Sequence, residues 1–286
     1  MRSRTFATAL LGAAVLLAAP ARAEDPAAPK PAAAKKPEPP ALRIGEPVPA
    51  FQATDVDGRA FDLAKARSAS PDEALAAVAE AAKTCGATSV TRETTLDSIK
   101  GLVKDGAPDT EARLAFATSA GRTYGLLPDR AKVAEWTTVG DVATWLEGAS
   151  KAPIVFVAWS SACPTCKMYD ERLATAASST GARVYLFACN WNDEDAAIRA
   201  AVTERKVPFP VLIDRDQKVA GALGARKTPH CFVLDESNTL RYAGAIDSDA
   251  ALQAEPEKRV PWLQDALAAL ADGRSSFDVL VTTPKG

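Results

Sequence analysis

The chain has 286 residues, with 34 Lys and Arg against 36 Asp and Glu, a formal net charge of −2 and five cysteines. A mildly acidic chain without a basic run offers no electrostatic footprint for nucleic acid or for an anionic membrane, so we expect neither as a partner. Residues 42–286 are numerous enough for one large domain, or for a domain with an insertion.

The N-terminus is typical of a secretory signal peptide over residues 1–23. Arg2 and Arg4 give it a charged start, residues 6–19 an apolar core, and Ala21-Arg22-Ala23 a small-residue cleavage site. The apolar core is shorter than the ~20 residues that a transmembrane helix needs. We therefore expect cleavage near Ala23 and a periplasmic or secreted protein, in an oxidising compartment. Loss of three arginines takes the formal charge from −2 to −5.

The next segments predict a spacer followed by helices. Residues 24–41, rich in Pro, Ala and Lys, cannot bury a core and predict a flexible linker. In the stretch of about 66–139, the run Ser70-Pro71-Asp72-Glu73 is a strong helix start, and residues 94–103 and 110–119 also predict helices. We expect a helical insertion packed on the domain edge. A platform for a partner or substrate is the alternative, although no residue argues for it.

The C-terminal half alternates apolar strands with amphipathic helices. Residues 154–159 are apolar throughout, which predicts a buried central strand. Asn192 with Asp193 and Glu194 predicts the cap and acidic first turn of a later helix. The order β-α-β-α-β-β-α implies a mixed sheet with helices on both faces. The other predicted segments are helices at 141–148, 167–178, 217–223 and up to Gly273, and strands at 184–189, 210–213, 231–234 and 240–246.

Cys163-Pro164-Thr165-Cys166 lies between the strand at 154–159 and the following helix, so both thiols stand at a helix start. Backbone N–H groups and the helix dipole stabilise a Cys163 thiolate there. Pro164 suits the first helical position, because its missing N–H costs nothing at that point. Cys166, one turn on, can attack a mixed disulfide formed at Cys163. The pattern indicates thiol–disulfide exchange, although zinc sites and structural disulfides share the spacing.

Thr228-Pro229 comes just before the strand at 231–234, roughly sixty residues after Cys166. This placement resembles the cis-proline loop that faces the dithiol in thioredoxin-fold proteins. The resemblance implies that Thr228 and Pro229 bind the substrate, with the Thr228 backbone holding an incoming peptide by strand-like hydrogen bonds.

Two further regions extend the resemblance. Motifs within residues 42–63 are similar to the opening β-hairpin of the redoxin group, which includes the AhpC/TSA proteins and the TlpA/ResA-like thiol–disulfide oxidoreductases, and motifs within 209–235 are also typical of it. The similarity covers about 43–65 and 140–272.

The fold that this resemblance implies is α/β: a thioredoxin-like three-layer fold with a mixed sheet, an N-terminal β-hairpin and a helical insertion at about 66–139. We expect this redoxin domain over residues 42–273, followed by a C-terminal tail over 274–286.

The remaining cysteines are weaker candidates. Cys231 falls in a buried strand and is expected to be an inert core thiol. Cys189 ends a strand on the side of the sheet where the dithiol should lie, so a structural thiol and an auxiliary redox thiol both stay open, and Cys85 is unassigned. A Cys189–Cys231 disulfide is disfavoured, because in this fold the strand at 154–159 should separate them.

Several residues near the dithiol are candidates for tuning its pKa: Pro164, Thr165, Trp159 and His230, the single histidine. A zinc site would need two more ligands beside Cys163 and Cys166, so we expect no metal and no other cofactor. Covalent haem attachment is excluded, because no histidine follows Cys166.

Two departures from thioredoxins matter. Val157 stands six residues before the first cysteine, where thioredoxins carry a buried aspartate that assists proton transfer to the second cysteine. Another group, or water, must serve as the base here. Ala162 stands where thioredoxins usually have Trp directly before the first cysteine.

The leading hypothesis is an exported thiol–disulfide oxidoreductase that reduces or exchanges protein disulfides with its CPTC dithiol. Its partners would be disulfide- or dithiol-bearing client proteins and a membrane or soluble electron donor, and the sequence leaves the direction of electron flow open.

Two alternatives stay open. Cys163-Pro164-Thr165, with Ser160 three residues earlier, resembles the peroxidatic motif of a peroxiredoxin-like thiol peroxidase. Against it, Phe156 stands where a proline is expected, and Arg226 is the nearest arginine to the Pro229 motif. The other alternative is a non-enzymatic redoxin-fold binding protein, against which the intact dithiol counts.

Overall fold

The structure is a computed structural model that describes residues 43–103, 106, 108–249 and 253–274. The predicted signal peptide over 1–23, the linker over 24–41 and the tail beyond Arg274 lie outside these residues. Within the described ranges, no helix is long and apolar enough to cross a membrane.

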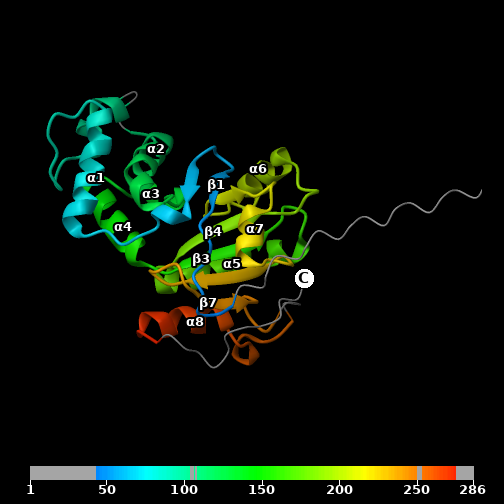
Figure 1. Ribbon diagram of the computed structural model, residues 1–286. Helices are drawn as coiled ribbons and strands as arrows, with labels where there is room; N and C mark the ends of the chain where they lie inside the picture. The colour runs from blue at the N-terminus through cyan, green and yellow to red at the C-terminus, as the bar shows by residue number, and fades with distance from the viewer. Residues whose placement is uncertain (1–42, 104–105, 107, 250–252, 275–286) are drawn as a thin grey trace, which may run out of the picture. The chain divides into compact units, whose positions relative to one another are not determined.

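A seven-stranded mixed sheet forms the centre, with the strand order β2-β1-β5-β4-β3-β6-β7 (Figure 1). Strands β3, β4 and β5 are parallel, whereas β6 is antiparallel to β3, β7 to β6, and β1 to both β2 and β5. The strands are β1 (Gln52–Asp55), β2 (Ala60–Asp62), β3 (Ile154–Trp159), β4 (Arg183–Ala188), β5 (Val211–Ile213), β6 (His230–Leu234) and β7 (Leu240–Gly244).

The helices lie on both faces of this sheet and in the segment between β2 and β3. They are α1 (Pro71–Thr84), α2 (Thr110–Gly121), α3 (Arg130–Val133), α4 (Val139–Lys151), α5 (Pro164–Thr180), α6 (Asp195–Glu204), α7 (Lys218–Leu223) and α8 (Trp262–Ala271).

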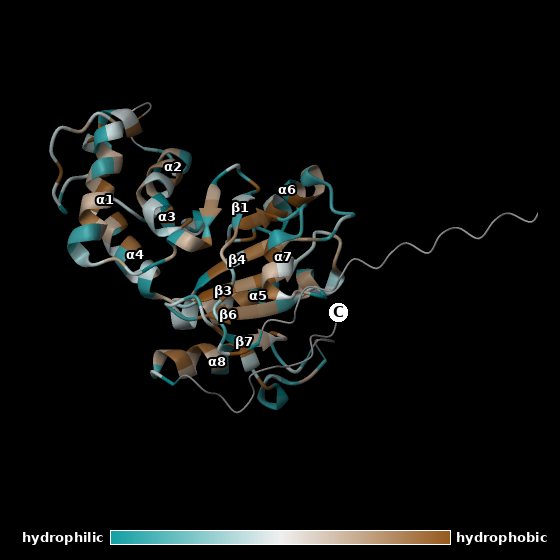
Figure 2. Ribbon diagram, in the orientation of Figure 1, coloured by the Kyte–Doolittle hydropathy of each residue, from teal (hydrophilic) through white to brown (hydrophobic). Residues whose placement is uncertain are grey.

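Strands β3 and β4 are buried at every residue, and Figure 2 shows their apolar character. Because successive side chains of a strand point to opposite faces, the strands supply two separate cores. Val155, Val157 and Trp159 pack with α5, α6 and α8 on one face. Phe156 and Ala158 pack with α7 and the β1–β2 hairpin on the other. The predicted three-layer α/β fold with a mixed sheet and an N-terminal hairpin is confirmed.

The outer edge of β7 is covered by residues 45–48. The Gly45 N–H donates to the Leu240 carbonyl oxygen at 2.8 Å, and the Leu240 N–H donates to the Glu46 carbonyl oxygen at 3.0 Å. One step further along, the Val48 N–H donates to the Asn238 carbonyl oxygen at 2.9 Å. The segment before the hairpin therefore supplies main-chain partners at the start of an edge strand.

The inserted helices bury a hydrophobic cluster of their own. It is built from α1, α2 and α4 and from the turns between them, with Val78, Phe116 and Leu146 among its most buried members. Helix α1 starts as predicted, with a capping box in which Ser70 and Glu73 bind each other's backbone N–H groups. Helix α4 belongs to the same cluster, so the insertion packs as a unit through residue 151, beyond the predicted boundary near 139.

The helix predicted at 94–103 is wrong. The segment forms two short 3₁₀ turns, Leu96–Ser98 and Lys100–Leu102, on either side of the extended Ile99. The cause lies at Gly101, whose N–H donates to the Cys85 carbonyl oxygen at 2.9 Å. A Cβ atom at Gly101 would lie 2.5 Å from that oxygen, so the chain passes very close to the end of α1. This contact with a preceding helix competes with regular helix formation.

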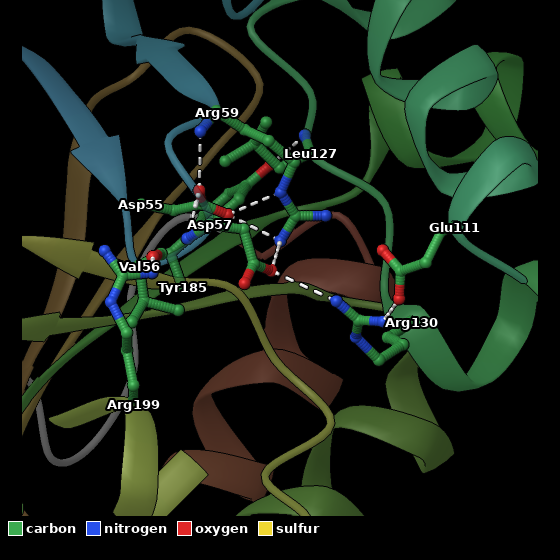
Figure 3. A network of polar contacts seen from close by, with 9 residues as sticks. All are labelled: Asp55, Val56, Asp57, Arg59, Glu111, Leu127, Arg130, Tyr185 and Arg199. Carbon is green, nitrogen blue, oxygen red and sulfur yellow. Dashed lines mark hydrogen bonds and ion pairs between the residues drawn. The ribbon is translucent and has the colours of Figure 1, made fainter. Parts of the chain in front are cut away.

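A network of charges joins the insertion to the hairpin turn (Figure 3). The Arg59 Nε–H donates to Asp55 Oδ2 at 2.6 Å, and Arg59 also pairs with Asp57 at 3.3 Å. Arg130, from α3, lies 3.4 Å from Asp57 and also pairs with Glu111 of α2. Asp55 is buried, whereas the Arg130 pairs are half-exposed, so apolar packing rather than these pairs supplies most of the stability.

A second buried network ties α5 to the segment after β7. The Asp247 carboxylate accepts from the Tyr169 hydroxyl, from Arg172 Nη1 at 2.8 Å and from the Asp249 N–H at 2.8 Å. Arg259 Nε lies 3.8 Å away. Asp247 is 5% exposed, so its charge is compensated inside the protein.

Candidate active site

Cys163 stands at the junction between β3 and α5, as the sequence predicts. It is the N-cap residue of α5, with extended backbone, and Pro164 occupies the first helical turn. The Cys163 Sγ accepts a hydrogen bond from the Cys166 N–H at 3.2 Å, which satisfies one of the unpaired donors of the helix start. Cys163 is half-buried, whereas Cys166 is 1% exposed. The first sulfur can therefore be reached by a partner, and the second is held behind it.

The loop before β6 faces this sulfur. The Thr228–Pro229 peptide bond is cis, as predicted, and Pro229 is buried. The Thr228 carbonyl oxygen lies 3.5 Å from the Cys163 Sγ. The structure thus brings Cys163, Cys166, Thr228 and Pro229 together from two segments that are far apart in the sequence.

The two thiols have opposite electrostatic environments. Hydrogen bonds from the Cys166 side chain, the Thr228 side chain and the backbone at Cys166 and Thr165 lower the pKa of Cys163 to about 5, although burial acts in the opposite direction. The hydrogen bond with Cys163 and burial raise the pKa of Cys166. At neutral pH, Cys163 is therefore a thiolate that accepts hydrogen bonds, and Cys166 is a protonated donor.

A buried aspartate that the sequence analysis assigned to a helix cap supports the dithiol loop instead. Asp193 Oδ1 accepts from the Ser160 hydroxyl at 3.2 Å, and its Oδ2 accepts from the Ser161 N–H at 2.9 Å. The N-cap residue of α6 is Glu194, and its side chain makes no capping hydrogen bond. The predicted cap at Asn192 is therefore wrong, and Asp193 lies outside the first turn of α6, because its carboxylate, 3% exposed, is aimed at the loop before Cys163.

Beneath the dithiol lies a polar group that the sequence analysis missed. The Trp159 indole N–H donates to Asp170 Oδ1 at 3.3 Å. Arg205 Nη1 lies 3.5 Å from Asp170 Oδ2, and the Arg205 guanidinium stacks 5.1 Å from the centre of the Trp159 ring. Arg205 also donates to the Ser161 carbonyl oxygen. No motif marks Asp170 or Arg205, and only the spacing of four residues from Cys166 to Asp170 along one helix could have drawn attention to them.

His230 begins β6 opposite Ala158, and its ring lies 4.2 Å from that of Phe232. Burial, followed by the charge of Lys227, lowers the pKa of His230 to about 4. The imidazole is therefore neutral at pH 7. The groups that mainly set the pKa of Cys163 are the side chains of Cys166 and Thr228 and the nearby backbone, so His230 contributes no charge to the dithiol.

The other cysteines are free thiols. Cys231 is fully buried beside Val157, and burial raises its pKa. Burial likewise raises the pKa of Cys189 to about 11. Strand β3 separates the strands of these two residues, as expected. Within the described ranges, no group of three or more His, Cys, Asp or Glu side chains could hold a metal ion.

The sheet order, the dithiol at the β3–α5 junction and the cis-proline opposite it define a thioredoxin-like α/β fold. The family model described as Redoxin matches residues 128–257. This match starts before α3 and ends after β7, and it includes both the dithiol and Pro229. This match supports a general role in thiol–disulfide redox chemistry.

Several solved structures are similar to this chain. An uncharacterized conserved protein from Geobacillus kaustophilus is 18% identical, with 84% of this chain and 89% of that chain covered and a TM-score of 0.49. A hypothetical protein from Sinorhizobium meliloti is 17% identical, with 85% and 92% covered and a TM-score of 0.48. The thioredoxin domain of a thiol-disulfide oxidoreductase from Bacteroides vulgatus is 10% identical, with 70% and 86% covered and a TM-score of 0.37. No curated protein matches the sequence.

Proposed function

We propose that the protein is an exported thiol–disulfide oxidoreductase that exchanges disulfides with client proteins through Cys163 and Cys166. The observation that carries the proposal is the half-buried Cys163 Sγ, held at a helix start by the Cys166 N–H at 3.2 Å. Its lowered pKa makes it a thiolate at neutral pH, and the thiolate is the species that attacks a disulfide.

The reaction follows from the positions of the two sulfurs. The Cys163 thiolate attacks one sulfur of a client disulfide, forms a mixed disulfide and releases the other client sulfur as a thiolate. Cys166 then attacks Cys163 Sγ, which breaks the mixed disulfide and leaves a Cys163–Cys166 disulfide. Two electrons pass to the client, and the reverse sequence oxidises a client dithiol.

The loop that contains Thr228 is the proposed binding site of the client chain. Its carbonyl oxygen lies beside Cys163 Sγ, so a client segment in extended conformation can pair with this backbone while its own sulfur faces the thiolate. The signal-peptide pattern of residues 1–23 supports a function outside the cytoplasm, where disulfide-bearing clients are found.

Trapping of the mixed disulfide tests this proposal. The full-length Cys166→Ser variant is expressed in the native compartment, and disulfide-linked partners are identified by mass spectrometry. The Cys163→Ala/Cys166→Ser variant is the matched control, because it keeps every other cysteine. We expect clients only with Cys163 present, together with insulin reduction by the wild type. Rapid peroxide turnover without trapped clients would favour a thiol peroxidase, and no reaction in either assay would favour a binding protein.

A further inference from the structure

The second step of disulfide exchange, in which Cys166 attacks the mixed disulfide, requires the removal of a proton from Cys166. Cys166 must lose its proton before it can attack the mixed disulfide, yet it is 1% exposed and its hydrogen bond and burial raise its pKa. At neutral pH a buried thiol of this kind rarely ionises unaided. A base within reach of Cys166 would remove this barrier.

Asp170 is placed to be that base. It lies four residues after Cys166 on α5, and residues at this spacing are neighbours on the surface of a helix. The Trp159 indole N–H holds its Oδ1 at 3.3 Å. Trp159 and Cys166 belong to the same buried cluster between α5 and the sheet, so the residue that binds Asp170 packs with the resolving cysteine.

The other oxygen of this carboxylate faces Arg205. Asp170 Oδ2 is buried and has no hydrogen-bond partner within the described part of the chain. Arg205 Nη1, 3.5 Å away, balances its charge without hydrogen-bond geometry. Buried polar atoms in folded proteins are nearly always hydrogen-bonded. Asp170 Oδ2 and the Arg205 Nη1 that faces it form only an ion pair, so Oδ2 can still accept a proton.

The carboxylate also senses the state of the dithiol. Burial raises the pKa of Asp170, the hydrogen bond from Trp159 and the positive charge of Arg205 lower it, and the negative charge of Cys163 raises it. When Cys163 enters a mixed disulfide, that charge disappears. The loss of that charge lowers the pKa of Asp170, which favours the carboxylate when Cys166 has to give up its proton.

We propose that Asp170 is the acid–base residue of the dithiol and accepts the Cys166 proton when the mixed disulfide is resolved. The inference rests on the exchange reaction proposed above. Within the described residues no direct hydrogen bond joins Asp170 to Cys166, and the proposed transfer uses one bridging water, a route that general acid–base catalysis allows.

The step balances as follows. The Cys166 proton moves to Asp170 Oδ2, and the Cys166 thiolate attacks Cys163 Sγ. The Cys163–Cys166 bond forms, the bond from Cys163 to the client breaks, and the client leaves as a thiolate. Asp170 then returns its proton to solvent or to that thiolate.

The test separates the two chemical steps. The reduced full-length protein is mixed with a small chromogenic aromatic disulfide, which releases one coloured thiolate when Cys163 attacks and a second when Cys166 resolves. In the Asp170→Asn variant we expect a first phase within about twofold of the wild type and a second phase slowed roughly 100-fold, the range of general-base catalysis. The matched control is Glu171→Gln, which removes the charge of the exposed neighbouring residue on the same helix.

The pH profile of the second phase distinguishes a base from a merely structural residue. The titratable and charged groups that face Asp170 are Cys163 and Cys166 at the start of α5 and Arg205 after α6. We expect the wild-type rate to level off above the pKa of Asp170, and the Asp170→Asn rate to rise with pH without that inflection. An unchanged second phase in Asp170→Asn, or a slower one that keeps the inflection, would overturn the proposal.

A measurement on the carboxyl group itself keeps the test valid if Asp170→Asn fails to fold. Carbon NMR of labelled Asp carboxyl groups should show that the pKa of Asp170 falls in the Cys163→Ala variant, because a negative charge nearby is lost. An unmoved Asp170 resonance would contradict the coupling. Absence of both thiolate phases in the wild type would instead refute the exchange function, and with it the role of Asp170.

Discussion

The Cys163 Sγ lies 3.5 Å from the carbonyl oxygen of Thr228, although 65 residues separate them in the chain. This contact exists because β3 and β6 are neighbours in the sheet, so the end of one strand meets the start of the other. A nucleophile on one side and an exposed main-chain acceptor on the other form a site for an extended polypeptide that carries sulfur.

The first prediction concerns the reactivity of Cys163. Because its pKa is lowered to about 5, mainly by the hydrogen bond from Cys166, the rate of alkylation by iodoacetamide should be nearly constant from pH 7 to 8 and should halve near pH 5. The Cys163→Ser variant supplies the background from the other thiols. An inflection near the ~8.5 of a free cysteine would show that the thiolate is not stabilised.

The stability of the reduced protein should depend on pH with a defined sign. The folded pKa of Cys163 lies below its unfolded value of 9.0, so the thiolate stabilises the folded state fully above pH 9, and this contribution is lost as the pH falls through about 5. The difference in unfolding free energy between reduced wild type and Cys163→Ser should therefore shrink as the pH falls from 8 to 5. Urea denaturation under reducing conditions measures it, and a constant or growing difference would contradict the assignment.

The cysteines should differ sharply in function. Cys163→Ala should abolish insulin reduction, because it removes the half-buried thiol whose pKa is lowered, whereas the pKa values of Cys166, Cys189 and Cys231 are raised. Cys231→Ala should leave activity largely intact and cost about 1 kcal/mol of stability, since it removes only a small fully buried side chain. Equal loss of activity from the two changes would show that the reactive thiol is misassigned.

Asp193 should matter for the shape of the dithiol loop. Asp193→Ala leaves the Ser161 N–H and the Ser160 hydroxyl without their acceptor, so we expect a destabilisation of about 1–3 kcal/mol and a slower alkylation of Cys163. The control is Glu194→Ala, which changes the exposed neighbouring carboxylate, with no side-chain capping bond. Equal effects from both variants would remove Asp193 from its supporting role.

Asp247 should be the more costly carboxylate to remove. Asp247→Ala strips Tyr169, Arg172 and Arg259 of a shared buried partner and leaves Arg172 with Asp249 alone, so we expect a loss of about 3–5 kcal/mol in urea unfolding. Asp272→Ala, an exposed carboxylate after α8, should change stability by less than about 0.5 kcal/mol. A loss below about 1 kcal/mol for Asp247→Ala would show that water compensates the charges.

The sequence predicts the parts of the site that depend on local pattern. Cys163 and Cys166 follow a continuous apolar strand and precede an amphipathic helix, and Pro229 precedes another strand, so their spacing places them at neighbouring strand ends. Asp170 and Asp193 could not be found in this way. Each is a common polar residue whose role depends on side chains brought to it by the tertiary fold.

The errors in secondary structure have the same origin. Residues 94–103 carry enough apolar side chains for a helix, but Gly101 is held against the Cys85 carbonyl group, and this tertiary contact decides the conformation. The helix predicted at 141–148 is present as α4, but its place within the insertion also depends on tertiary packing. Its side chains pack with α1 more than with the sheet, and no local pattern reports that choice.

The segment of residues 45–48, which pairs with the start of β7, has a consequence for self-association of the protein at high concentration. An uncovered strand at the border of a sheet is a template for another molecule, and aggregation can start there. Here the hydrogen-bonding groups of Leu240 are already occupied from within the same chain. Truncation up to Pro49 would free them, and the shortened protein should self-associate while its dithiol still reacts.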